Sequence, residues 1–162
     1  MNKSSVTALN LWFKKGNHHA GQGRHDKAIA CFDQALELSP HCAPVLFFKA
    51  ESLAEVGRLE EALVYYDLCL YYNPHYRDVY CNKGYTLYLL GRFAEANDCL
   101  DQALRFMFPG AETWYNKAVT VDALGRLDEA VRAYDKFLEL ATPDMGKEIK
   151  EVRQRLQELE SK

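Results

Sequence analysis

The side chains of this sequence that could carry out chemistry are mainly those of its five histidines and five cysteines. The histidines are His18, His19, His25, His41 and His75. Zinc would need several such ligands within about 2.0–2.3 Å of one ion. His41 and His75 each follow a proline, at equivalent turns of a repeating pattern. Turns on adjacent rungs of stacked helices lie roughly 10 Å apart, because helix axes pack 8–10 Å apart. We therefore interpret these histidines as polar loop residues and predict no metal site.

Composition excludes further classes of function. Lys and Arg number 20 against 23 Asp and Glu, a net charge of −3, without the basic stripe typical of nucleic-acid binding. The first residues lead into no apolar run, so we expect no signal peptide and no membrane span. An odd number of cysteines without paired spacing indicates a reducing compartment, and we expect a cytoplasmic protein. The sequence has no glycine-rich phosphate loop and no nucleophile elbow, which predicts no enzyme, no catalytic residue and no cofactor.

A period of 34 residues organises the chain, and columns of equivalent residues show it. One column holds small residues: Gly16, Ala50, Gly84 and Ala118. A second holds glycines that each precede an arginine: Gly23, Gly57, Gly91 and Gly125. A third holds alanines: Ala28, Ala62, Ala96 and Ala130. Small side chains at these places let two helix backbones approach closely, while bulky columns fill the space beside them.

Between the glycines and prolines, apolar residues recur every three or four positions, which predicts helices. The predicted helices are 7–19, one from His25 or Asp26 to just before Pro40, Ala43–Glu55, Leu59–Tyr72, Arg77–Leu89, Phe93–Phe106, Ala111–Ala123 and Leu127–Leu140. We expect residues 1–6 to fray. Gly57, Gly91 and Gly125 should adopt positive φ where helices end.

These columns resemble the tetratricopeptide repeat, whose signature is Trp-x2-Leu-Gly-x2-Tyr, then Ala-x3-Phe, then Pro. The Trp place holds Trp12, Leu46, Tyr80 and Trp114; the Ala-x3-Phe pairs are Ala28/Phe32, Ala62/Tyr66, Ala96/Leu100 and Ala130/Tyr134; the prolines are Pro40, Pro74, Pro109 and Pro143, the last two one residue late. The resemblance implies an all-α fold, a right-handed superhelical α-solenoid of antiparallel helix pairs. We expect a single domain over 1–162, with repeats at about 9–42, 43–76, 77–110 and 111–144.

The sequence departs from the family pattern at the leucine before the Gly place, which is always lysine. These lysines are Lys15, Lys49, Lys83 and Lys117. We expect them to lay their stems on apolar surface and keep their ammonium groups in water.

The C-terminal stretch, about 145–160, does not repeat the pattern. Ile149, Val152, Leu156 and Leu159 fall on one narrow face, and most other positions are charged. Stacked repeats leave an apolar end face that a polar-backed helix closes. We interpret this stretch as a capping helix; a charged tail that frays is the alternative.

The resemblance also implies that one face of each first helix lines a concave groove. The predicted peptide-binding residues on this face are Phe13, Asn17, Phe47, Phe48, Glu51, Asp78, Asn82, Tyr85, Glu112, Tyr115 and Asn116. Family members that bind a chaperone's C-terminal carboxylate do so with cations and asparagines here, whereas this sequence places carboxylates. We therefore expect a neutral or basic segment, held by its backbone through Asn82 and Asn116, whose amides offer both donors and an acceptor.

Two function classes follow. The first is a non-catalytic scaffold that binds a protein or peptide partner in the groove. The second is a self-assembling structural unit, which would make the protein a homo-oligomer, because Leu9 and Trp12 begin a first helix with no neighbour before it.

Overall fold

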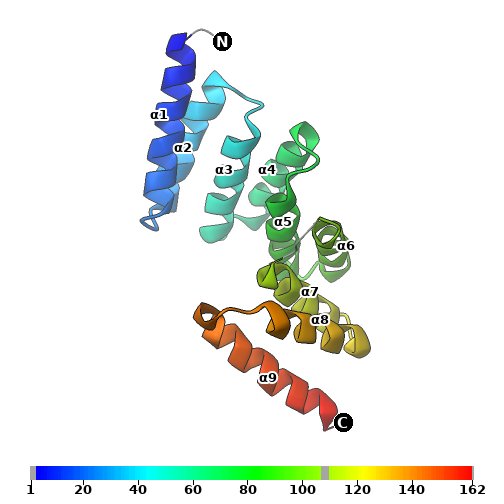
Figure 1. The fold of residues 1–162 in the computed structure, drawn as a ribbon. Helices are drawn as coiled ribbons and strands as arrows, with labels where there is room; N and C mark the ends of the chain where they lie inside the picture. Colours follow the sequence, from blue (N-terminus) through cyan, green and yellow to red (C-terminus); the bar gives the residue numbers. More distant parts are fainter. Residues whose placement is uncertain (1–2, 107–109, 162) are drawn as a thin grey trace. The chain divides into compact units, whose positions relative to one another are not determined.

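The structure, a computed structural model, describes residues 3–106 and 110–161, and every regular element in that part of the chain is helical (Figure 1). The helices are α1 (Lys3–Ala20), α2 (His25–Leu38), α3 (Ala43–Glu55), α4 (Leu59–Tyr72), α5 (Arg77–Leu89), α6 (Phe93–Leu104), α7 (Ala111–Ala123), α8 (Leu127–Leu140) and α9 (Gly146–Glu160), with a 3-10 turn, η1 (Pro143–Met145), before the last. This all-α array of helix pairs confirms the predicted fold class. Pro109 lies outside the described residues. No described helix combines the length and the apolarity that crossing a membrane requires.

Three predicted helix bounds are wrong, one of them because α1 ends at Ala20 rather than at residue 19. Helix α1 begins at Lys3 rather than near residue 7, because no glycine or proline interrupts the residues before that point. Helix α6 ends at Leu104 rather than Phe106. The amides of Arg105 and Phe106 donate to carbonyls three residues back, at 3.1 and 3.3 Å, so the chain tightens out of the α conformation there.

Glycine ends the first helix of each pair at the predicted turns. Gly57, Gly91 and Gly125 have φ of 78°, 73° and 74°, and Gly23 has 70°. At the Gly57 turn the Arg58 amide donates back to the Leu53 carbonyl at 2.9 Å, the long-range bond of a Schellman motif. The positive φ at these turns is thereby confirmed.

The chain divides into two compact units, Met1–Thr86 and Leu87–Lys162. In the first unit Ala28, Phe32, Ala35 and Val45 form a buried cluster with Leu9 and other residues of α1 packed against it. The close approach of α1 and α2 leaves no room at Gly16, where a Cβ atom would lie 2.3 Å from the Phe32 ring.

In the second unit α9 packs against the α7–α8 pair, as predicted for a cap. Its Val152 is buried in one cluster with Phe137 and Val121, and Ile149 and Leu156 pack beside it. Arg155 of α9 also donates to both carboxylate oxygens of Asp122 in α7, at 2.7 and 2.8 Å.

The expectation that the lysine column stays in water is wrong for two of its members. Lys49 and Lys117 are only 7% and 4% exposed. Lys49 pairs with Asp33 and donates to the Tyr65 hydroxyl. The Lys117 ammonium donates to Asn97 at 2.6 Å, and ion pairs satisfy the rest of its charge. A buried ammonium group is tolerated because it is paired and hydrogen-bonded.

Candidate functional site

Aromatic side chains build a wall in the first unit. The Phe13 ring centroid lies 5.5 Å from that of Phe48, and the Phe47 centroid lies 5.2 Å from Phe48 and 5.0 Å from Tyr76. Such tilted contacts are the favoured geometry for aromatic pairs. Phe47 is buried, whereas Phe13 and Phe48 are half-buried. The wall therefore holds three of the predicted groove residues in a fixed arrangement.

A hollow of about 370 Å³ opens beside this wall, between the C-terminal end of α1, the start of α2 and one face of α3. Its lining residues are Asn17, Ala20, Gly21, His25, Phe48, Glu51, Ser52 and Glu55. The structure thus brings the predicted residues Asn17, Phe48 and Glu51 together around one space. Two carboxylates line this hollow, and no Lys or Arg of the described residues does.

A hydrogen bond fixes one of these carboxylates. The Asn82 amide donates to Glu51 Oε1 at 2.8 Å, from α5 to α3. Burial raises the pKa of the Tyr66 phenol, and the nearby Glu51 carboxylate adds to this effect, so the hydroxyl stays neutral. Glu51 and Glu55 are the acidic residues that line the hollow.

Two polar atoms at the hollow have no protein partner. Asn17 Oδ1 and His25 Nδ1 are buried from solvent, and neither has a hydrogen-bond partner among the described residues. Buried polar atoms are normally hydrogen-bonded, and leaving one unsatisfied costs about 1–3 kcal/mol. Both residues line the hollow, and the Asn17 amide oxygen is an acceptor for a donor of a bound group.

Three more of the predicted residues do not line the hollow. Asp78 is exposed and pairs with its neighbour Arg77 at 2.9 Å. Tyr85 is exposed on α5, and Glu112 is exposed in the first turn of α7.

In the second unit, Tyr115 and Asn116 are covered. The Tyr115 hydroxyl donates to Glu151 of α9 at 3.2 Å, and burial, together with that carboxylate, raises the pKa of Tyr115 to about 12. Asn116 is only 4% exposed. The expectation that Asn82 and Asn116 present equivalent amides is therefore not met, because one is bonded to Glu51 and the other is buried.

A second hollow, of about 450 Å³, lies in the second unit between α7 and α8. Its lining residues are Trp114, Lys117, Glu129, Arg132, Ala133, Asp135, Lys136 and Glu139. Because cations and carboxylates alternate around it, it favours no single charge of ligand.

Three residues that line the hollow, His25, Ser52 and Glu55, are not among the residues predicted for the groove. Ser52 and Glu55 follow Phe48 at four and seven residues, a spacing that puts all three on one helix face, so periodicity could have found them. His25 was interpreted as a loop residue but begins α2, and only the packing of α2 beside α1 brings it to the hollow. His18 and His19 lie in α1, as the predicted helix over 7–19 has them.

The hollow offers no metal centre. Within residues 3–106 and 110–161, no group of three or more His, Cys, Asp or Glu side chains is arranged to hold a metal ion.

Models of the tetratricopeptide repeat match the chain over residues 10–42, 43–76 and 81–144. No curated protein sequence matches it.

Solved structures share the fold at low sequence identity. A Pseudomonas aeruginosa protein, pilF, is 20% identical with a TM-score of 0.81, over 96% of this chain and 72% of its own. MamA of Desulfovibrio magneticus RS-1, residues 41 to the end, is 14% identical with a TM-score of 0.78, over 95% of this chain and 94% of its own.

A third relative was solved with a ligand. The first repeat domain of Spaghetti (RPAP3), bound to the HSP90 peptide SRMEEVD, is 20% identical with a TM-score of 0.71, over 74% of this chain and 94% of its own. Repeat positions, turn glycines and family matches agree from residue 10 to residue 144. This chain therefore belongs to the tetratricopeptide repeat family, whose fold commonly serves as a non-catalytic scaffold for protein interactions.

Proposed function

We propose that this protein is a protein–protein interaction scaffold whose hollow at Asn17, Phe48, Glu51 and Glu55 binds a basic side chain of a partner segment. The observation that carries the proposal is the lining of the hollow, which contains two carboxylates, an aromatic ring and an amide oxygen without a hydrogen-bond partner. Within residues 3–106 and 110–161, no Lys or Arg lines it. We further propose that residues 1–162 act as one domain. The cytoplasm remains the expected location.

Arginine fits this lining best on chemical grounds. Its guanidinium group carries five N–H donors and no acceptor. Glu55 and Asn17 Oδ1 are acceptors, and the Phe48 ring provides a face on which a cation can lie. Lysine satisfies fewer acceptors because its ammonium group has only three donors.

The rest of the predicted face extends the site in this proposal. Asp78 would attract a further cation of the segment, and Tyr85 would contact its apolar side chains. Asn82 supports Glu51 through their hydrogen bond. The acidic lining is opposite in sign to what the HSP90 peptide SRMEEVD, with its two glutamates and terminal aspartate, would need.

The test is a calorimetric titration with a matched set of capped peptides, Ser-Gly-X-Gly-Ser, in which X is arginine, lysine, citrulline or norleucine. We expect the arginine peptide to bind most tightly and the citrulline peptide, which is similar in shape but uncharged, to bind at least about tenfold more weakly. One charge-assisted hydrogen bond is worth about 1.5–3 kcal/mol, which supports a difference of that size. Affinity should also fall as salt rises, since screening acts over about 8 Å at physiological ionic strength.

The protein variants for this test are Glu51→Gln with Glu55→Gln, and Glu37→Gln as the matched control on the exposed surface of α2. The double variant should lose the preference for arginine over citrulline, and the control should keep it. Equal binding of both peptides by the wild-type protein would overturn the proposal.

A further inference from the structure

A second surface of the first unit, separate from the hollow, is left open by the repeat pattern. Its residues, Leu11, Lys14, Lys15 and His18, form one face of α1, here called the uncovered face. Leu11 is 51% exposed, whereas the residues at its place in α3, α5 and α7 are buried: Val45 at 1%, Val79 at 0% and Thr113 at 7%. His18 is exposed, whereas Ser52, Thr86 and Thr120 at its place are 0–2% exposed. A helix normally occupies this side of a first helix, and none does at α1 among the described residues.

The lysine column shows what such a helix contributes. Lys49 pairs with Asp33, Lys83 with Asp67 and Lys117 with Asp101, and in each pair the aspartate lies 16 residues earlier, on the preceding second helix. Lys15 has no carboxylate partner in the described part of the chain; its ammonium group lies over the Trp12 ring, 4.6 Å from the centroid. One aspartate is therefore missing from an otherwise regular ladder.

The charge around the uncovered face matches the missing group. Helix α1 contains lysines and histidines and no Asp or Glu. Lys27 also stands at the place that Glu61, Glu95 and Glu129 occupy in the other repeats. A carboxylate on the approaching surface would thus meet Lys14, Lys15 and Lys27 with no acidic residue of α1 to oppose it.

We propose that the uncovered face of α1 binds an acidic amphipathic helix of a partner protein, which places a carboxylate on Lys15 as Asp33 does on Lys49. The helices that cover the other lysines share a pattern, an aspartate followed two residues later by a small residue: Asp33 with Ala35, Asp67 with Cys69, Asp101 with Ala103. The small residue lets the covering helix approach closely; Ala35 lies in one buried cluster with Val45. The partner helix therefore carries Asp-x-Ala or Asp-x-Cys in an otherwise apolar face.

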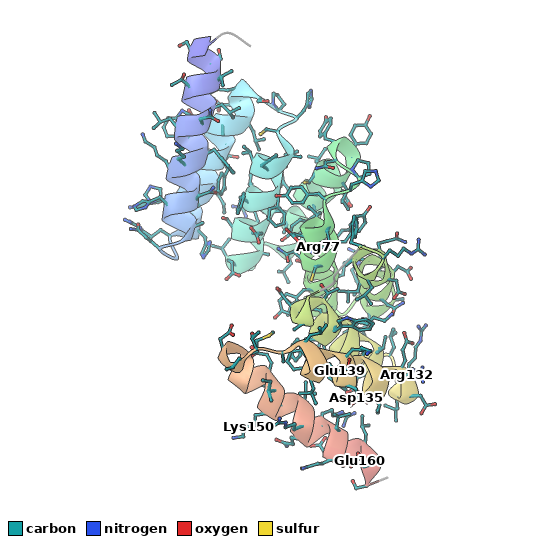
Figure 2. All side chains as sticks on the ribbon, in the orientation of Figure 1. Arg77, Arg132, Asp135, Glu139, Lys150 and Glu160 are labelled. Carbon is teal, nitrogen blue, oxygen red and sulfur yellow. The ribbon has the colours of Figure 1, made fainter. Side chains whose placement is uncertain are left out.

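A second copy of this chain is a weaker candidate for the occupant. Asp135 of α8 is the next member of the aspartate column and has no ion pair among the described residues (Figure 2). However, Phe137 on the same helix is already buried in a cluster with Val152 of α9. The face of α8 that carries Phe137 is therefore already occupied and does not cover α1 of another copy.

The experiment uses the full chain and a probe copied from the chain itself. The probe is a synthetic peptide of residues 25–42, which contains Asp33 and Ala35, stapled at the outward positions 30 and 34 because a helix this short is marginal in water. We expect amide shifts at Leu11, Lys15 and His18 on titration, under reducing conditions. Lys15→Glu should weaken binding at least about tenfold. Arg77→Glu, the same charge change at an exposed arginine away from α1 (Figure 2), should change it less than twofold.

A charge swap separates a specific pair from general attraction. A probe with Asp33→Lys should bind the Lys15→Glu protein more tightly than it binds wild type. Equal losses in Lys15→Glu and Arg77→Glu, or shifts that map outside α1, would overturn the proposal. Concentration-dependent self-association that Lys15→Glu abolishes would also overturn it, since the occupant would then be a second copy.

Discussion

The two units of this protein share the same repeat positions, but equivalent residues line an open hollow in the first unit and are covered in the second. In the first unit Phe48 and Glu51 line an open hollow. Their equivalents in the second unit are Asn116, which is buried, and Val119, which packs against the cluster that contains Val152 of α9. The place of Glu55 is taken by Ala123. A repeat position therefore fixes which way a side chain points, and the neighbouring helix decides whether a ligand can reach it.

The largest expected effect comes from removing that neighbour. Val152→Asp puts a charge at a site that is only 1% exposed, and an uncompensated buried charge costs about 3–5 kcal/mol. We expect α9 to leave α7 and α8 and the second unit to become open like the first. Urea unfolding gives the loss of stability, and hydrogen exchange over Leu127–Leu140 gives its location. Gln154→Asp, on the exposed side of α9, is the control; equal protection in the two variants would show that α9 is not a cap.

The next effect tests the packing behind the aromatic wall. Gly16→Ala places a Cβ atom 2.3 Å from the Phe32 ring. Overpacking of this kind costs about 1–3 kcal/mol of stability. Since Phe32 packs against both Phe13 and Phe48, the change should also weaken peptide binding in the hollow. In the second unit the same place already holds a methyl group, that of Ala118, which is fully buried. Unchanged thermal unfolding of the Gly16→Ala protein would contradict the close approach of α1 and α2.

A smaller effect is expected from breaking one lysine–aspartate pair in each unit, because the lysines of these pairs differ in burial. Lys83 is half-buried, whereas Lys117 is almost fully buried. We expect Asp101→Asn to cost about 1–3 kcal/mol, as for a buried charged group that loses a hydrogen bond, and Asp67→Asn to cost about 0–1 kcal/mol, as for an exposed pair. Chemical unfolding of both variants measures the difference. Equal losses of unfolding free energy would show that burial of the lysine does not determine how much the ion pair contributes to stability.

The smallest effect is a pH dependence confined to the first unit. Burial, together with Arg24, His18, Lys27 and Lys15, lowers the pKa of His19 below its usual 6.5. The unfolded chain therefore binds a proton at a higher pH than the folded chain does. The lowered pKa of His19 therefore makes the folded state depend on pH. The stability of the protein with neutral His19 is fully present above about pH 6.5 and is lost as the pH falls below that value toward the pKa of the folded state. His19→Gln should reduce the fall in stability below pH 6.5 relative to wild type, and an identical pH profile would contradict the lowered pKa.

Local sequence signals predicted most of the fold because this chain's helices are bounded by residues with strong backbone preferences. Glycine at Gly57, Gly91 and Gly125 takes the positive φ that ends a helix. Apolar residues at every third or fourth position, between glycines and prolines, predicted the bounds of α3, α4, α5, α7 and α8 as the structure has them. The family and the helix-pair architecture follow from those local features repeated at a constant period.

The tertiary structure decided what the repeat pattern leaves open, namely which side chains have neighbours. Lys49 and Lys117 look like surface lysines in the sequence, and only packing shows that aspartates 16 residues earlier reach them. Asn82 and Asn116 occupy the same place in neighbouring repeats, yet one is bonded to Glu51 and the other is buried. Helix periodicity is a property of a segment alone, whereas burial and pairing depend on distant segments that pack against it.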